Sequence, residues 1–229
     1  MGASKSGLPG LSILAVPLMA IVFDTKESTG LLLGILIIGD IFAIIYHRQN
    51  ARWQYVIRLL PATLCGIVAG YYGMRQITNE QLRPIIGVIV LLMLGLNFWR
   101  MHRRQKDKNI PAPLWLSFWL GFLAGVTTMM ANAAGPVMII YLIAMRLPKM
   151  EFVGTAAWFF FIINWIKVPF SANLGLMSME SIKVDLMMIP FIFIGAISGY
   201  FILQKIPQKT FNTIAQLLAA AAAVKLLFG

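Results

Sequence analysis

The sequence predicts an all-α, polytopic membrane protein with two inverted repeats, whose broken or re-entrant helices meet near the middle of the bilayer. Of its 229 residues, 59% are hydrophobic and 12% are charged, with a mean hydropathy of +0.81, and this charged fraction is about half that of a soluble domain. The long apolar segments are apolar on every face, whereas the strands of a membrane barrel alternate. Two runs of small, polar and helix-breaking residues interrupt the apolar sequence, about 125 positions apart.

The two interruptions, residues 4–10 and 127–136, predict where a ligand binds. The first reads Ser-Lys-Ser-Gly-Leu-Pro-Gly, and the second reads Thr-Thr-Met-Met-Ala-Asn-Ala-Ala-Gly-Pro. Lipid cannot hydrogen-bond to free backbone groups, so irregular backbone at membrane depth is tolerated only inside protein or beside a water-filled cavity. Paired interruptions in corresponding halves are the best indication in a sequence of a transporter's binding site.

Four apolar stretches in the first half are predicted to be spans or half-spans: residues 8–23, 28–46, 55–72 and 84–99. Ser28 is a suitable N-cap for the second stretch. Pro61 is expected to kink the third stretch. Pro84 is expected to start the fourth after a loop at residues 75–83, because the missing N–H of proline costs nothing at a helix start.

Five apolar stretches follow in the second half: residues 114–129, 137–147, 152–170, 183–204 and 211–228. A perpendicular crossing needs about 20 residues. The stretch 137–147 is therefore long enough for only half a crossing. We expect it to be a half-helix that begins at mid-membrane, next to Gly135 and Pro136.

A basic segment at residues 100–113 divides the chain into a first membrane repeat, 1–99, and a second, 114–229. The net charge is +11, and its Lys and Arg residues lie in short loops. The positive-inside rule places the loop from Arg100 to Lys108 in the cytoplasm. The opposite side then receives the acidic residues Asp24, Glu27, Glu80, Glu180 and Asp185.

This orientation makes the two half-helices run in opposite directions, so that the halves are related by inversion, as in many secondary carriers. At an offset of 124 residues, Gly30 aligns with Gly154 and Asp40 aligns with Asn164. A helix precedes the second break, but almost nothing precedes the first. By symmetry we expect a leading helix before Ser4, which is missing because translation starts late or the chain is truncated.

Both breaks lie at the N-terminal ends of half-helices, where free N–H groups and a partial positive charge attract anions. Two opposed half-helices would direct both positive ends at one point, which predicts a small anion with several oxygens as substrate. The alternative is that Gly and Pro only kink packed helices. The candidate substrate-binding residues are Ser4, Lys5, Ser6, Gly7, Pro9, Gly10, Thr127, Thr128, Asn132, Gly135 and Pro136.

Three residues within the spans, Asp40, Asn164 and Lys167, are candidates for coupling or gating. An acid inside the membrane is costly and is a functional hypothesis by default. Asp40 could carry a coupling proton or pair with Lys5; a structural pair with Arg58, or a hydrogen bond to backbone, is the alternative. Lys167 is expected to extend to the outer interface, with a role in substrate binding as the alternative.

Several classes of function are excluded. The chain has no Gly-Lys-Ser/Thr phosphate loop, so it does not hydrolyse ATP itself. One cysteine excludes an internal disulfide and a Cys-based metal site. Asp40 has no second acid in the membrane with which to form a protease pair, and no basic domain with interleaved aromatic residues exists for nucleic acid. We therefore predict no enzyme, cofactor, metal or nucleic-acid partner.

The second break and its surroundings resemble the sulfite exporter TauE/SafE family. The residues that carry the resemblance are Ala131 to Pro136, Tyr141-Leu142, Leu147-Pro148-Lys149, Phe152 to Thr155, Asn164 and Lys167 to Phe170, with Ser4 to Gly10, Ser28 to Leu32 and Asp40 in the first half. The resemblance covers almost the whole chain. It implies a bacterial inner-membrane permease for sulfur-containing anions such as sulfite, sulfonates or thiosulfate. The chain departs from the family in lacking the leading helix.

The predicted function is a secondary transporter whose partners are a small anionic substrate and the lipid bilayer. A passive anion channel and a membrane scaffold or sensor subunit stay open as alternatives, and so does assembly as a homodimer. The sequence does not distinguish proton from sodium coupling, or export from import.

Overall fold

The computed structural model describes residues 12–103, 114–145 and 147–205, and the single positions 217, 221, 224, 227 and 228. Throughout these residues the regular structure is helical, which confirms the predicted all-α class. The helices in chain order are α2 (Ser12–Val22), α3 (Thr25–His47), the short 3₁₀ helix η1 (Arg48–Asn50), α4 (Trp53–Gln76), α5 (Asn79–Arg103), α6 (Leu114–Ala131), α7 (Gly135–Ala144), α8 (Lys149–Asn173) and α9 (Met179–Lys205).

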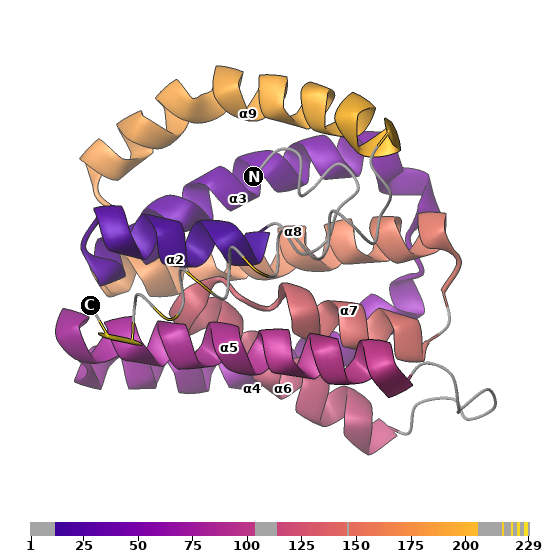
Figure 1. Cartoon of the computed structure of the whole chain (residues 1–229), viewed down its shortest axis with the longest axis horizontal. Coiled ribbons are helices and arrows are strands. Elements are labelled where there is room, and N and C mark those ends of the chain that lie inside the picture. Colours follow the sequence, from indigo (N-terminus) through magenta and orange to yellow (C-terminus); the bar gives the residue numbers. More distant parts are fainter. Residues whose placement is uncertain are drawn as a thin grey trace.

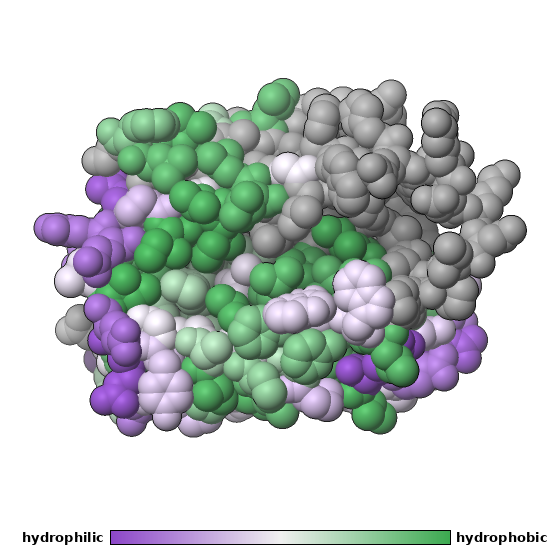
Figure 2. All heavy atoms as spheres, turned by 90° about the horizontal axis from the view of Figure 1, so that it is seen from below, coloured by the Kyte–Doolittle hydropathy of each residue, from purple (hydrophilic) through white to green (hydrophobic). Residues whose placement is uncertain are grey.

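The molecule has the surface of a membrane protein. Its helices run mainly along one axis (Figure 1). On the face shown in Figure 2, hydrophobic residues occupy the middle, and hydrophilic residues gather at the two ends of this axis. Among the described residues, α4, α6 and most of α3 and α8 are long and apolar enough to cross a membrane. Exposed side chains such as Ile57, Leu92 and Phe191 are the ones that lipid would cover.

Two short helices stand beside these long ones. α2 has 11 residues and α7 has 10, so each rises about 15–17 Å at 1.5 Å per residue, near half the apolar thickness of a bilayer. α2 leads into the start of α3, and α7 leads into the start of α8 (Figure 1). The short stretch predicted after the second break is therefore a separate helix.

α3 and α8 pack together in opposite directions at the centre of the molecule. Gly30, near the start of α3, lies against Leu176, just after the end of α8. Asp40 contacts Asn164 in the middle, and Arg52, beyond the end of α3, contacts Thr155 near the start of α8. α3 also packs against α9 and α2, and α4 packs against α6 and α8.

Several element boundaries differ from the sequence-based expectation. Pro84 was expected to start a helix, but α5 already begins at Asn79, so Pro84 lies in its second turn. The predicted loop at 75–83 is reduced to Ile77 and Thr78, where the backbone of Ile77 is extended. Proline lacks the N–H that position 84 would donate to the carbonyl of Glu80, and α5 continues without this one hydrogen bond. The predicted span 211–228 lies almost wholly outside the described residues.

Candidate anion site at the second helix break

The second break is shorter than its polar run predicts. α6 continues through Thr127 and Thr128 to Ala131, and only residues 132–134 separate it from α7. Asn132 has a φ of 50°, in the left-handed region that asparagine enters more readily than most other side chains. The N–H of Asn132 still donates to the carbonyl of Thr128 at 3.0 Å. Asparagine therefore ends α6 here, and this turn directs its amide into the protein.

The amide of Asn132 joins three segments of the chain. Its Nδ2 donates to the backbone carbonyl of Thr29 on α3 at 2.9 Å. Its Oδ1 accepts a hydrogen bond from Nζ of Lys167 on α8 at 2.5 Å. Because the side chain is only 7% exposed, both bonds are shielded from water. Asn132 thus connects the break with both central helices.

Lys167 is a buried cation beside the break. Its side chain is 1% exposed, and its Nζ also donates to Oγ1 of Thr128 at 3.1 Å. The expectation that Lys167 extends to the outer interface is wrong, because its ammonium group turns inward to these polar oxygens. One signal in the sequence pointed inward: Lys167 is three positions after Asn164, and residues at this spacing share one face of a helix.

Gly135 and Pro136 start α7, as the sequence predicted. Proline is well placed at this point because a helix leaves its first N–H groups without partners within the helix. The hydroxyl of Thr127 donates to the carbonyls of Leu123 and Ala124 in its own helix. Thr128, by contrast, accepts from Lys167, so the two threonines of the predicted site have different surroundings.

Asp40 and Asn164 face each other at the contact between α3 and α8. Nδ2 of Asn164 donates to Oδ2 of Asp40 at 2.7 Å, and the two side chains are 0% and 1% exposed. Oδ1 of Asn164 is buried and has no hydrogen-bond partner. The two residues aligned at an offset of 124 are therefore in direct contact.

The first break lies outside the described residues, and with it Ser4, Lys5, Ser6, Gly7, Pro9 and Gly10. The part of the site that the structure describes comes from the second break, α3 and α8. In this part of the chain no group of three or more His, Cys, Asp or Glu side chains could hold a metal ion.

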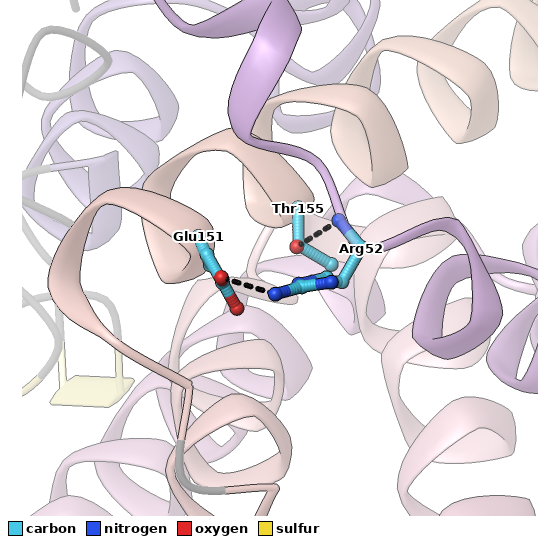
Figure 3. Close-up of polar contacts among 3 residues, drawn as sticks. All are labelled: Arg52, Glu151 and Thr155. Carbon is cyan, nitrogen blue, oxygen red and sulfur yellow. Dashed lines mark hydrogen bonds and ion pairs between the residues drawn. The ribbon is translucent and has the colours of Figure 1, made fainter.

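A further polar contact ties the α3–α4 connection to the start of α8 (Figure 3). The N–H of Arg52 donates to Oγ1 of the buried Thr155 at 2.9 Å, and its guanidinium donates to Oε1 of Glu151 at 2.6 Å. The hydrogen bond from Arg52 to Glu151 raises the pKa of the arginine. No sequence motif pointed to this contact, because it joins residues about 100 positions apart.

Asp185, which the charge pattern assigned to the outer side, is a buried residue of α9. It lies in the second turn of this helix and is 5% exposed. Asp185 and Asp40 are thus two buried acids on neighbouring helices.

The arrangement around Lys167 suits a small oxyanion. A buried ammonium, an amide, a hydroxyl and the N-terminal end of α7 come together where α6 stops. Charge-assisted hydrogen bonds to an anion are about twice as strong as neutral ones, and a helix N-terminus adds a partial positive charge.

Comparison with known proteins identifies one family. The sequence model described as "Sulfite exporter TauE/SafE" matches residues 1–226 of the 229. No curated protein and no solved structure matches the chain.

Proposed function

The chain belongs to the sulfite exporter TauE/SafE family, a family of multi-pass membrane transporters, and from this premise we propose that it is a secondary carrier of small sulfur-containing oxyanions. The proposed substrates are sulfite, sulfonates or thiosulfate, and the proposed membrane is the bacterial inner membrane with the loop from Arg100 to Lys108 in the cytoplasm. One observation carries the proposal: a buried lysine, on a helix long and apolar enough to cross a membrane, donates to polar groups at a helix break. Such a residue marks a substrate or ion pathway.

In this proposal, Lys167, Asn132 and Thr128 bind the oxyanion together with the N-terminal end of α7. Lys167 supplies the charge, and the two neutral side chains supply directional hydrogen bonds. When the anion binds, it replaces the hydrogen bonds that Lys167 now makes with Thr128 and Asn132. These groups already lie close together, so they need little rearrangement to bind it. Residues of the first break, Ser4, Lys5 and Ser6, are proposed to approach from the other repeat.

We further propose that the two halves are inverted repeats, with Asp40 and Asn164 at their axis. The starts of α2 and α7, α3 and α8, and α4 and α9 are 123, 124 and 126 positions apart. A position that contacts its own symmetry mate must lie near the axis, and Asp40 and Asn164 are 124 positions apart and hydrogen-bonded. At this place the pair would gate the movement of one repeat against the other.

Thermal unfolding of the detergent-purified full chain tests the anion site. The panel is sulfite, thiosulfate, sulfate, taurine, acetate and chloride. A ligand that binds the folded state at 100 times its Kd stabilises it by about 2.7 kcal/mol. We expect one sulfur oxyanion to give a selective increase in unfolding temperature.

The variant Asn132→Gly keeps the left-handed backbone, which glycine adopts without cost, and removes only the amide. In this variant the anion should no longer raise the unfolding temperature. Thr127→Val is the matched control, because its hydroxyl bonds only to its own helix, and it should keep the increase. No increase with any anion, or an undiminished one in Asn132→Gly, would contradict the proposed site.

Counterflow separates a carrier from a channel. In proteoliposomes loaded with unlabelled sulfite, a carrier exchanges it for labelled sulfite outside, and the exchange saturates. Flux that neither saturates nor shows counterflow would favour a passive anion channel.

A further inference from the structure

Asp185 is a buried carboxyl outside the anion site. Asp185 belongs to α9, which packs against α3. The side chain of Asp185 lies on Gly34 of α3. A Cβ atom added to Gly34 would be only 1.8 Å from Oδ2 of Asp185 and 2.5 Å from its Cγ. The absence of a side chain at Gly34 therefore makes the space that the carboxyl occupies.

Apolar side chains pack at the same helix contact as this carboxyl. Leu31, Ile35 and Ile192 form the buried cluster at the same contact between α3 and α9. Oδ1 of Asp185 is buried without a hydrogen-bond partner, and Asp185 forms no ion pair within the described part of the chain. The carboxyl also lies six residues after the start of α9, about 9 Å along the helix.

The charged groups of the neighbouring elements are engaged or placed elsewhere. On α3, Glu27 is exposed near the helix start, Lys26 is half-buried beside it, and Asp40 accepts from Asn164. On α9, Lys183 is exposed. α2 has no titratable residue, and Lys167 of α8 donates to Thr128 and Asn132.

We propose that Asp185 is a proton-binding site of the carrier, loaded in this conformation and emptied when α9 and α3 separate at Gly34. The inference rests on the proposed transport function and names its coupling ion. A carboxylate binds one proton from one side of the membrane, becomes a neutral acid, and releases the same proton when water reaches it. Burial away from charge partners favours the neutral form of a carboxyl group.

The site suits a proton better than a metal cation. Metal cations such as Ca²⁺ require six or more oxygen ligands, and Mg²⁺ requires near-octahedral coordination. The carboxyl lies against Gly34, which offers no side-chain ligand, and the buried cluster at the same helix contact is aliphatic. A proton needs only one carboxyl oxygen.

Infrared spectroscopy of the full chain in lipid tests the site without a substrate, because the C=O stretch of a carboxylic acid is absent from a carboxylate. We expect a carboxylic-acid band at neutral pH that Asp185→Asn removes. Asp40→Asn, and Glu27→Gln at the exposed start of α3, are the controls and should keep this band. If Asp185→Asn does not fold, Asp185→Glu keeps an acid and should shift the band. Absence of the band from wild type, or its survival unshifted in both Asp185 variants, overturns the proposal.

A second measurement tests coupling. Proteoliposomes that contain a trapped pH indicator receive a sulfite gradient, and wild type is expected to move protons with sulfite. Asp185→Asn should move no protons while sulfite counterflow continues. Proton movement in Asp185→Asn equal to that in wild type overturns the coupling role. If wild type shows no counterflow with any anion of the panel, the proposed function fails, whereas the infrared band still decides the proton site.

Discussion

The contact between α4 and α6 and the contact between α3 and α8 hold the molecule together in different ways. Between α4 and α6, glycines bring the two backbones close: a Cβ atom on Gly66 would be 2.1 Å from the carbonyl oxygen of Phe122, and one on Gly125 would be 2.1 Å from that of Thr63. Between α3 and α8, polar side chains meet instead, in the pair Asp40 and Asn164.

The difference indicates which contact is a scaffold and which can rearrange. Close backbone packing through small residues is a major source of helix association in membranes. If two such helices move apart, their backbones lose these contacts and gain no others in exchange. Interhelical hydrogen bonds in membrane proteins average about 0.6 kcal/mol each, so one set can replace another at low cost. We infer that α4 and α6 move as one body, and that the polar contacts around α3 and α8 change during transport.

The largest expected effect is on the scaffold. Gly66→Ala places a methyl group where the Phe122 carbonyl lies, and overpacking of this kind costs about 1–3 kcal/mol or more. Gly73→Ala is the matched control on the same helix, because nothing lies within 4 Å of its added Cβ. Gly73→Ala should be neutral or slightly stabilising, since alanine is the better helix former. Equal unfolding temperatures of the purified variants would refute the role of Gly66.

The next largest effect is expected at the polar contacts around α3 and α8. Lys167→Met removes the buried cation and should abolish the anion-induced increase in unfolding temperature, which corresponds to a stabilisation of about 2.7 kcal/mol at 100 times Kd. Without anion, its stability should fall by about 1–3 kcal/mol, because Oδ1 of Asn132 loses its donor. Lys183→Met, which changes an exposed lysine on α9, is the control and should keep the increase. If Lys167→Met responds to anions as wild type does, Lys167 has only a structural role.

The pair Asp40 and Asn164 gives a sharper test of the same contact. Asp40→Asn replaces the carboxyl group with an amide and should slow sulfite counterflow across the whole pH range. The exchanged variant, Asp40→Asn with Asn164→Asp, moves the carboxylate to the symmetry-related position and should restore most of the flux if the pair lies on the axis of the repeats. Flux in the double variant that is no faster than in Asp40→Asn would argue against this axis. A changed pH profile in Asp40→Asn would assign proton coupling to Asp40 as well.

The sequence predicted the class of the scaffold better than its contacts. Composition and the length of the apolar stretches predicted helices and the short segment after the second break, because each is a local property of the chain. The importance of Gly66 and Gly125 could not be predicted, since a glycine shows its function only when its partner backbone is known. Pro84 was misplaced because the preference of proline for the first helical position is only a tendency, and α5 continues through Pro84 without the one N–H that proline lacks.

For the polar contacts around α3 and α8, the sequence predicted which residues take part but not how their side chains are arranged. Asn132, Asp40 and Asn164 were identified as candidates, but Lys167 was expected to turn toward the membrane surface. A lysine side chain is long enough to reach either way, so only the position of Asn132 and Thr128 decides its direction. The charge pattern assigned Asp185 to the outer side, and its burial could not be predicted because the glycine that accommodates it lies about 150 positions earlier in the chain.

The smallest effect separates the two parts of the contact in Figure 3. Thr155→Val removes the buried hydroxyl that accepts from the N–H of Arg52, and the loss of such a hydrogen bond should lower the free energy of unfolding by about 1 kcal/mol. Arg52→Gln removes the exposed ion pair with Glu151 and should leave the unfolding temperature unchanged, because water and salt screen exposed pairs. If Arg52→Gln were instead the more damaging variant, the exposed charges would hold this end of α8. Surface charge would then be a third kind of contact, one that fixes the start of α8 and the polar contacts along this helix.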